Sequence, residues 1–221
     1  IEHPMAGILC APKPGVIDMD KPTIQMLLRY TADGGEENDM QMYLMNHVPL
    51  YDLPEMMETF GVEVAFGVFP GLQRPESRGR IHVESTDPSV APRIELNFFD
   101  TEADKRRMRE GMRIAWKVVN SAAVLEHAEN ILLLDQATVD DDDALDKYVW
   151  DTAIQIFHPV GTAKMGSAED PDAVVDQFGR VHGVDRLRVV DASIMPTIPR
   201  ANTNLTTIMI GERIADWIAN S

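Results

Sequence analysis

Apolar and polar residues alternate with period two along much of the first hundred residues. Residues 39–47 and residues 61–69 each carry their large apolar side chains at every second position. This alternation is typical of strands that bury one face. Residues 80–97 contain two more alternating runs, joined by a turn at Asp87 and Pro88. Together these stretches predict an antiparallel sheet.

From residue 101 the spacing of apolar residues changes to three or four. Residues 101–121 predict an amphipathic helix, with Thr101 and Asp104 at capping-box positions. A second helix is predicted within residues 138–153. Four consecutive aspartates, residues 140–143, suit the positive N-terminal end of that helix. The acidic run could also bind calcium, but the solvated helix start is the favoured interpretation.

The pattern predicts an α+β fold in two parts. Residues 1–157 are predicted to form an antiparallel-sheet domain with flanking helices. Residues 158–221 combine a glycine-containing loop, a short buried strand within residues 186–196 that ends at Asp191, and a terminal helix over 204–220. The second part is too short to hold an independent core, so we expect it to complete a domain begun elsewhere.

Composition narrows the possible partners. The 221 residues are 44% hydrophobic and 25% charged, which is ordinary for a globular protein. The formal net charge of −16 disfavours nucleic acid or an anionic membrane, because phosphate binding relies on Lys and Arg. One cysteine, Cys10, excludes an internal disulfide and favours a reducing, cytoplasmic location. No apolar run approaches the length of a membrane span. The chain starts at Ile1 rather than Met, and we expect this start to be truncated.

The segment FHPVGTAKMG, residues 157–166, holds the first candidate for chemistry, His158. Histidine titrates close to neutral pH and can therefore exchange protons. Pro159 favours an extended backbone at His158, and Gly161 permits a close approach of the chain behind it. A single histidine is more often a core or surface residue, so these features leave its role open.

Further candidates stand near the C-terminus. Asn202, Thr203 and Asn204 precede the apolar-periodic run of the last helix, whose free backbone N–H groups would favour negative charge. Simple capping explains these residues equally well. Asp191 ends the predicted strand, where open α/β sheets tend to carry ligands.

The order of these segments resembles one family. The tail HPVGTAKMG, GVDRLRVVDASIMP and NTNLTTIMIGERIADWI is similar to the C-terminal signature of the glucose–methanol–choline (GMC) family of flavin-dependent oxidoreductases, over residues 156–219. Upstream, Ser-x-Gly, Ser-x-Asp-Pro and Pro-x-Ile elements at residues 77–79, 85–88 and 92–94 resemble the substrate-domain segment of the same family. The first 60 residues match only loosely.

The resemblance implies FAD as cofactor and oxidation of an alcohol to an aldehyde or ketone. In the family, the histidine matched by His158 takes the hydroxyl proton, and the residue matched by Asn202 holds the alcohol oxygen. Such a base is needed because the hydroxyl proton must leave as the hydride passes to the flavin. The resemblance places cofactor contacts at Asp191, Ala192, Thr203 and Asn204, and we expect substrate contacts at Tyr43 and Phe157.

The resemblance also implies a missing portion. A family member should carry a Gly-x-Gly-x-x-Gly motif for the FAD pyrophosphate, yet no two glycines here stand two positions apart. We therefore expect residues 1–157 to be the C-terminal portion of the substrate-binding domain. Residues 158–221 would supply the active-site loop and the last strand and helix of the FAD-binding α/β domain. The N-terminal FAD-binding portion would be a separate chain or a cleaved piece, needed for FAD binding.

Several alternatives compete with this interpretation. Tyr43 stands where choline-oxidising relatives carry a histidine, which argues against choline specificity. A hydrolase is disfavoured because no Gly-x-Ser-x-Gly motif occurs. The six histidines show no metal-ligand spacing, so no metal is expected. An FAD-containing enzyme like the hydroxynitrile lyases and a non-catalytic flavoprotein subunit remain as alternatives.

Overall fold

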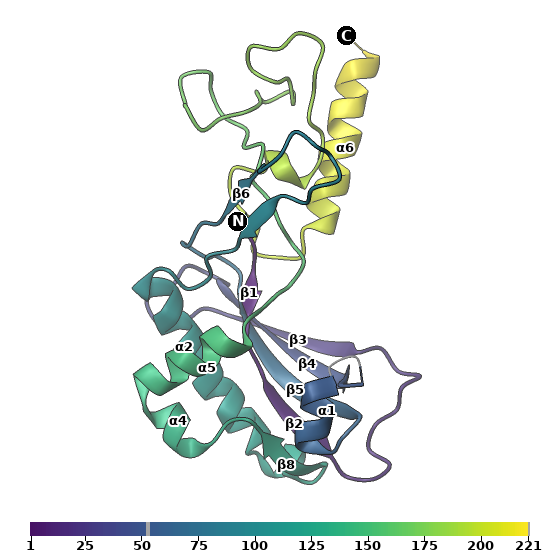
Figure 1. The fold of residues 1–221 in the computed structure, drawn as a ribbon, viewed down its shortest axis with the longest axis vertical. Coiled ribbons are helices and arrows are strands. Elements are labelled where there is room, and N and C mark those ends of the chain that lie inside the picture. Colours follow the sequence, from purple (N-terminus) through teal and green to yellow (C-terminus); the bar gives the residue numbers. More distant parts are fainter. Residues whose placement is uncertain (52–53, 221) are drawn as a thin grey trace. The chain divides into compact units, whose positions relative to one another are not determined.

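The computed structural model describes residues 1–51 and 54–220, which divide into two units. The sheet unit comprises residues 4–72 and 99–154 (Figure 1). The loop unit comprises residues 1–3, 73–98 and 155–221. The boundary predicted from the sequence, between residues 157 and 158, stays a prediction.

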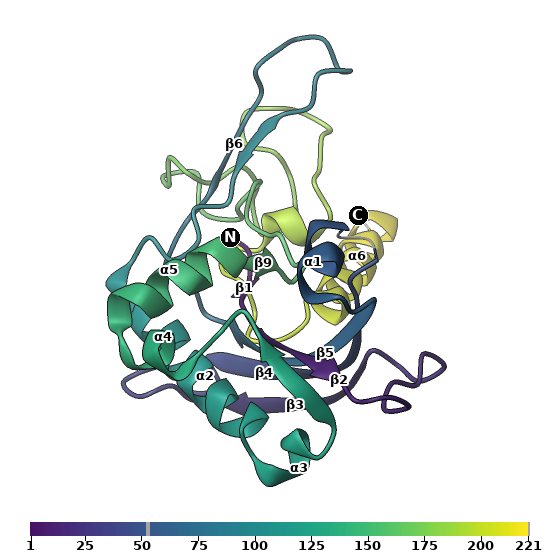
Figure 2. The ribbon, with the colours of Figure 1, turned by 60° about the horizontal axis from the view of Figure 1, so that its bottom comes forward.

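One antiparallel sheet organises the sheet unit. Within the described residues it has seven strands in the order β3-β4-β5-β1-β9, with β2 paired to β5 and β8 (Figure 2). Register is fixed by pairs such as Tyr43 with Phe69 and Leu9 with Gly67. The strands are β1 (Pro4–Met5), β2 (Ile8–Pro12), β3 (Ile24–Tyr30), β4 (Met40–Pro49), β5 (Val64–Leu72), β8 (Ala128–Leu132) and β9 (Ile154–Gln155). The two strands predicted at residues 39–47 and 61–69 are confirmed as β4 and β5.

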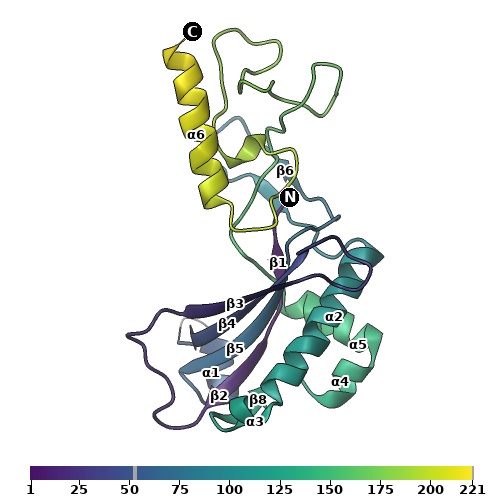
Figure 3. The same ribbon diagram turned by 180° about the vertical axis from the view of Figure 1, so that it is seen from behind.

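Helix α2 (Glu102–Val119) packs on the sheet and confirms the predicted amphipathic helix (Figure 3). The Thr101 hydroxyl accepts a hydrogen bond from the Asp104 backbone N–H at 3.2 Å, as the capping pattern predicts. Gly111 lets the helix approach closely, because a Cβ there would lie 2.9 Å from the Pro70 Cβ. The apolar stripe of the helix is buried at Met108, Met112, Ala115 and Val119.

The second predicted helix is present in two pieces, α4 (Gln136–Asp140) and α5 (Asp142–Thr152). Asp141 caps α5, since its carboxylate accepts the Ala144 N–H at 2.8 Å. The acidic run therefore starts a helix, as the favoured interpretation predicted. Among the described residues, no group of three or more His, Cys, Asp or Glu could hold a metal ion. Two short helices, α1 (Pro54–Phe60) and α3 (Ala122–Leu125), complete the sheet unit.

The loop unit holds a hairpin, a long irregular loop and a terminal helix. The predicted hairpin forms from β6 (Arg80–His82) and β7 (Arg93–Glu95), with Ile81 opposite Ile94. The last helix, α6 (Asn204–Ala219), is also confirmed (Figure 1). Its inner side packs Ile214 against Val175 and Ile194. Leu205, Ile208 and Ile218 of the same helix are exposed.

The prediction of a strand that ends at Asp191 is wrong. Residues 186–191 contribute only an isolated bridge between Arg180 and Arg188. Arg186 has φ +62°, in the left-handed region, which interrupts an extended run. After Asp191 the chain forms a short 3₁₀ turn, η1 (Ala192–Ile194). The apolar pattern here reflects burial of a loop, because Val189 and Val190 pack beside Ile214 without a continuous strand partner.

Candidate active site

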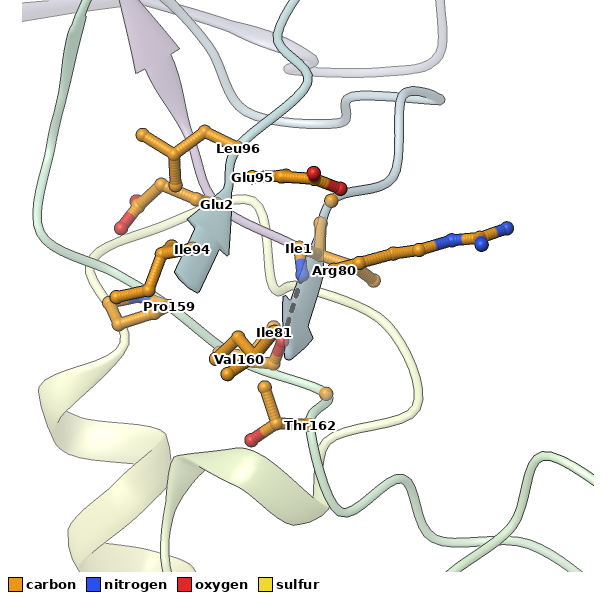
Figure 4. Close-up of a pocket in the computed structure, with 12 residues that line it drawn as sticks. Ile1, Glu2, Arg80, Ile81, Ile94, Glu95, Leu96, Pro159, Val160 and Thr162 are labelled. Atoms are coloured by element: carbon orange, nitrogen blue, oxygen red, sulfur yellow. Dashed lines mark hydrogen bonds between the residues drawn. The ribbon is translucent and has the colours of Figure 1, made fainter. Parts of the chain in front are cut away.

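The first three residues of the chain run antiparallel to the segment around His158. Ile1 and Val160 exchange two backbone hydrogen bonds, each 2.9 Å long, and Figure 4 draws the one that the Ile1 nitrogen donates. The Ile156 N–H donates to the His3 carbonyl at 3.0 Å. One residue, Glu2, separates the paired positions on the first segment, whereas residues 157–159 separate them on the second, so the pairing is irregular and this bulge, which contains His158, lies opposite Glu2.

Glu2 anchors both histidine backbones. Its carboxylate accepts the N–H of His158 and the N–H of His3, each at 2.8 Å. The side chain belongs to a residue that is only 7% exposed. Burial raises the pKa of the Glu2 carboxyl, and the hydrogen bonds from His158 and His3 oppose that rise. The N–H of His158 is therefore satisfied although no regular strand surrounds it.

The imidazole of His158 is held from both sides. Its Nδ1 lies 3.0 Å from Nδ1 of His3, and its Nε2 lies 3.2 Å from Nδ2 of Asn202. Burial lowers the pKa of His158, so the ring is neutral at pH 7. A neutral ring with one nitrogen beside an amide donor is suited to accept a proton.

The loop after His158 is fixed by its own backbone. Gly161 has φ +86°, and a Cβ there would lie 3.3 Å from the Met195 carbonyl oxygen. The N–H groups of Ala163 and Met165 donate to the carbonyls of Ser193 and Ile194 at 3.0 and 2.8 Å. This constraint agrees with the close approach that the sequence predicted at Gly161.

Phe157, immediately before His158, has an unusual backbone. Its φ is +64°, which is rare for a bulky side chain, and the residue is 75% exposed. Such strain persists only where the surroundings impose it, and it is common at functional sites. Tyr43 belongs to the sheet unit, where it is buried within β4. The substrate contacts expected at Tyr43 and Phe157 stay predictions.

The four predicted cofactor positions occupy two chain turns in the loop unit. Thr203 is the buried N-cap of α6 and makes no capping hydrogen bond with its side chain; Asn204 is the first helical residue. The Asp191 carboxylate accepts the Ser193 N–H at 2.8 Å and so caps η1. Ala192 packs beside the cluster of Val160, Met195 and Ile198. Their roles toward a cofactor stay predictions.

An open pocket of about 220 Å³ lies between the β6–β7 hairpin and residues 159–162 (Figure 4). Ile81, Ile94 and Val160 give it an apolar wall, and Arg80 and Glu95 stand at its edge. His158 and Asn202 do not line this pocket. We therefore do not assign it to the alcohol.

Sequence reasoning missed three residues of this site: Glu2, His3 and Gln73. His3 lies fully buried between His158 and the Gln73 carbonyl, whose oxygen is 3.0 Å from His3 Nε2. The contact between His3 and His158 joins residues 155 positions apart. No spacing or periodic signal in the sequence indicates a contact over that separation.

Residues 1–51 and 54–220 contain no helix with the length and apolarity needed to cross a lipid bilayer. Cys10 is buried and forms no disulfide. Burial raises the pKa of its thiol to about 11.

Comparison with known proteins defines the class. The C-terminal family model described as GMC oxidoreductase matches residues 75–211, so the chain belongs to the GMC oxidoreductase family. The oxygen-dependent choline dehydrogenase of Citrobacter koseri is 46% identical over 156 residues, which are 71% of this chain and 27% of that protein. The oxygen-dependent choline dehydrogenase 1 of Chromohalobacter salexigens is 37% identical over 188 residues, 85% of this chain and 33% of that protein.

Solved structures share the fold. Pyridoxine 4-oxidase from Mesorbium loti matches with a TM-score of 0.83 and 23% identity, over all of this chain and 43% of that chain. A formate oxidase of Aspergillus oryzae matches with a TM-score of 0.82 and 23% identity, over 98% of this chain and 46% of that chain. The chain thus spans less than half of these two oxidases and about a third or less of the two choline dehydrogenases.

Proposed function

We propose that this chain is the C-terminal portion of an FAD-dependent oxidoreductase that oxidises an alcohol to an aldehyde or ketone. The observation that carries the proposal is the 3.2 Å contact between Nε2 of His158 and Nδ2 of Asn202. A base and a hydrogen-bond donor converge there, which is what removal of a hydroxyl proton requires. Family membership supports the same reaction class.

In this proposal His158 is the general base. Its neutral Nε2 takes the hydroxyl proton of the alcohol, and the Glu2 carboxylate keeps the His158 backbone in place through the N–H. General-base assistance of this kind contributes about 10²–10⁴ to a rate. The Asn202 amide donates to the substrate oxygen as negative charge develops on it. Its side chain is exposed, and so available to an incoming molecule.

The residues present fit a flavin in their donor chemistry. The first N–H groups of α6 point out of a helix N-terminus, and the Thr203 side chain does not cap them. Such an end stabilises negative charge of the kind that reduced flavin carries at its pyrimidine edge. FAD, when bound, supplies the two-electron acceptor for the hydride. Thr203, Asn204, Asp191 and Ala192 would hold it from this chain. The A. oryzae formate oxidase is a relative in which FAD modification is described.

The proposal requires an N-terminal FAD-binding portion as partner. This chain lacks a Gly-x-Gly-x-x-Gly motif, and the matched segments are only 27% and 33% of the two choline dehydrogenases. The cytoplasmic location favoured by the single Cys10 belongs to the same proposal.

The test uses the complete flavoprotein mixed with alcohols in the absence of oxygen. The panel contains choline, aromatic primary alcohols and aliphatic primary alcohols. Bleaching of the oxidised flavin absorbance by at least one alcohol, with the matching carbonyl product, is the expected result. Persistent absorbance with every alcohol, together with cleavage of a hydroxynitrile, would replace the proposal by the lyase alternative.

A pair of variants tests the assignment of the base. His158→Gln is expected to slow flavin reduction by about 10²-fold or more, because glutamine cannot take the proton. The matched control is His82→Gln, the same change on the exposed hairpin strand β6. His82→Gln should reduce flavin at the wild-type rate. Equal rates in the two variants would remove His158 from the chemistry.

A further inference from the structure

Four groups form a continuous hydrogen-bonded chain through the loop unit. The Gln73 carbonyl oxygen lies 3.0 Å from Nε2 of His3, and Nδ1 of His3 lies 3.0 Å from Nδ1 of His158. Nε2 of His158 in turn lies 3.2 Å from Nδ2 of Asn202. His3 is fully buried and His158 is 9% exposed. Both nitrogens of both rings therefore have a partner.

The end groups of this chain fix the hydrogens in the middle. A carbonyl oxygen only accepts, so Nε2 of His3 carries the hydrogen that it donates to Gln73. A neutral imidazole has one N–H, and Nδ1 of His3 is therefore an acceptor. The hydrogen between the two Nδ1 atoms then belongs to His158. That leaves a lone pair on Nε2 of His158, which accepts from the Asn202 amide.

Burial supports the neutral state that this assignment needs. It lowers the pKa of His3 to about 4, and the charge that His158 would carry lowers it further. The carbonyls of Gln73 and Pro199 oppose this fall without reversing it. Glu2 is the acidic group that faces the pair, and its carboxylate is engaged by the backbone N–H groups of both histidines. Two neutral rings at pH 7 leave a single consistent placement of hydrogens.

We propose that His3 is a positioning residue that holds His158 in the Nδ1–H tautomer, which leaves Nε2 without a hydrogen and able to take the alcohol proton once the alcohol replaces the Asn202 amide there. This inference rests on the proposed function of His158 as the base. The two rings are perpendicular, with centroids 5.3 Å apart, so the contact also fixes the plane of His158. The wrong tautomer would present an N–H to the hydroxyl group, and no proton could be taken.

The direct test observes the hydrogens themselves. The complete flavoprotein is labelled with ¹⁵N in the histidine rings, and the signals of His3 and His158 are assigned by their loss in His3→Asn and His158→Gln. We expect a protonated-type signal for Nδ1 of His158 and an unprotonated-type signal for its Nε2. We expect the reverse pattern for His3. A protonated Nε2 on His158, or a protonated Nδ1 on His3, would overturn the proposal.

Two substitutions of His3 distinguish an effect on the tautomer of His158 from an effect on packing. His3→Asn keeps an acceptor oxygen close to the place of Nδ1, whereas His3→Leu fills the space without one. His3→Leu is expected to slow flavin reduction by about 10- to 100-fold with little change in alcohol affinity, and to give mixed tautomer signals at His158. His3→Asn should recover a rate within a few-fold of wild type. Wild-type reduction by His3→Leu would overturn the proposal.

Failure of the proposed function is distinguishable from failure of this inference. If no alcohol bleaches the wild-type flavin, the proposed function fails, while the ¹⁵N signals of the wild-type protein still decide the tautomer. If His3→Leu does not fold and retains no flavin, the wild-type signals and the rate of His3→Asn decide the question. A His3→Asn protein that folds with bound flavin yet is as slow as His158→Gln would count against the proposal.

Discussion

Nδ2 of Asn202 lies 3.2 Å from Nε2 of His158, although the two residues are 44 positions apart. The contact is made by two constrained segments. Val160 packs with Met195 and Ile198 just before the turn that leads to Asn202. A small apolar cluster therefore joins the two segments that carry the proposed catalytic pair, and we expect substitutions in this cluster to change the distance between His158 and Asn202.

Removal of the Asn202 amide should slow catalysis. We expect Asn202→Ala to reduce the rate of flavin reduction by about 10- to 100-fold, because one donor to the developing alkoxide is lost. Stopped-flow measurement of the flavin absorbance in the absence of oxygen gives this rate. Asn220→Ala is the matched control, since Asn220 forms its hydrogen bonds to Asp216 at the far end of α6. A wild-type rate in Asn202→Ala would show that the amide does not act on the alcohol.

The rate of flavin reduction should fall in acid. Burial lowers the pKa of His158 from its ordinary value of 6.5, and only the neutral ring accepts a proton. The rate should therefore be flat at neutral pH and decline with a midpoint below pH 6.5. Rapid-mixing measurements from about pH 5 to pH 8 at constant ionic strength cover this window. A midpoint above 6.5 would contradict the burial argument.

Acid should also destabilise the fold through His3. The pKa of His3 is about 4 in the fold against an ordinary 6.5, so the unfolded chain binds more protons between these values. The contribution of His3 to the unfolding free energy is thus intact above pH 6.5 and is lost as the pH falls toward 4. The full loss is at most about 3–4 kcal/mol.

Denaturant unfolding of the complete flavoprotein between these pH values measures the effect. His158 acts in the same direction because burial lowers its pKa, whereas burial raises the pKa of Glu2 and opposes them. The His3→Asn protein isolates the contribution of His3 to the unfolding free energy, since His158 and Glu2 are unchanged in it. It should lose less stability than wild type on acidification. Parallel curves for the two proteins would refute the assignment.

The backbone behind His158 should not tolerate a side chain. Gly161 has φ +86° and faces the Met195 carbonyl oxygen, so Gly161→Ala is expected to destabilise the protein by roughly 1–3 kcal/mol. Gly183→Ala is the control, because Gly183 has φ +74° with open space around it. The Gly183→Ala protein should lose only about 1 kcal/mol of unfolding free energy, because the substitution adds backbone strain without a close contact. Equal losses would mean that the Met195 contact is relaxed without cost.

Elements with strong periodicity could be predicted from the sequence. Helix α2 follows from its apolar spacing and the Thr101 cap, and β4 and β5 follow from their alternation. Other elements could not. Strand β2 is nearly all apolar and buried, so it lacks an alternating pattern. The run before Asp191 has a strand-like composition, but no adjacent strand pairs with it along its length.

The sequence by itself determined the family, the position of His158 and the start of the last helix at Asn204, because these depend on local motifs and on spacing along the chain. Only the tertiary structure decided that His3 and Glu2 belong to the site. Their contacts with His158 arise from an antiparallel pairing of chain segments more than 150 residues apart. Such pairing depends on where the folded backbone returns, and short-range patterns of residue type carry no information about that.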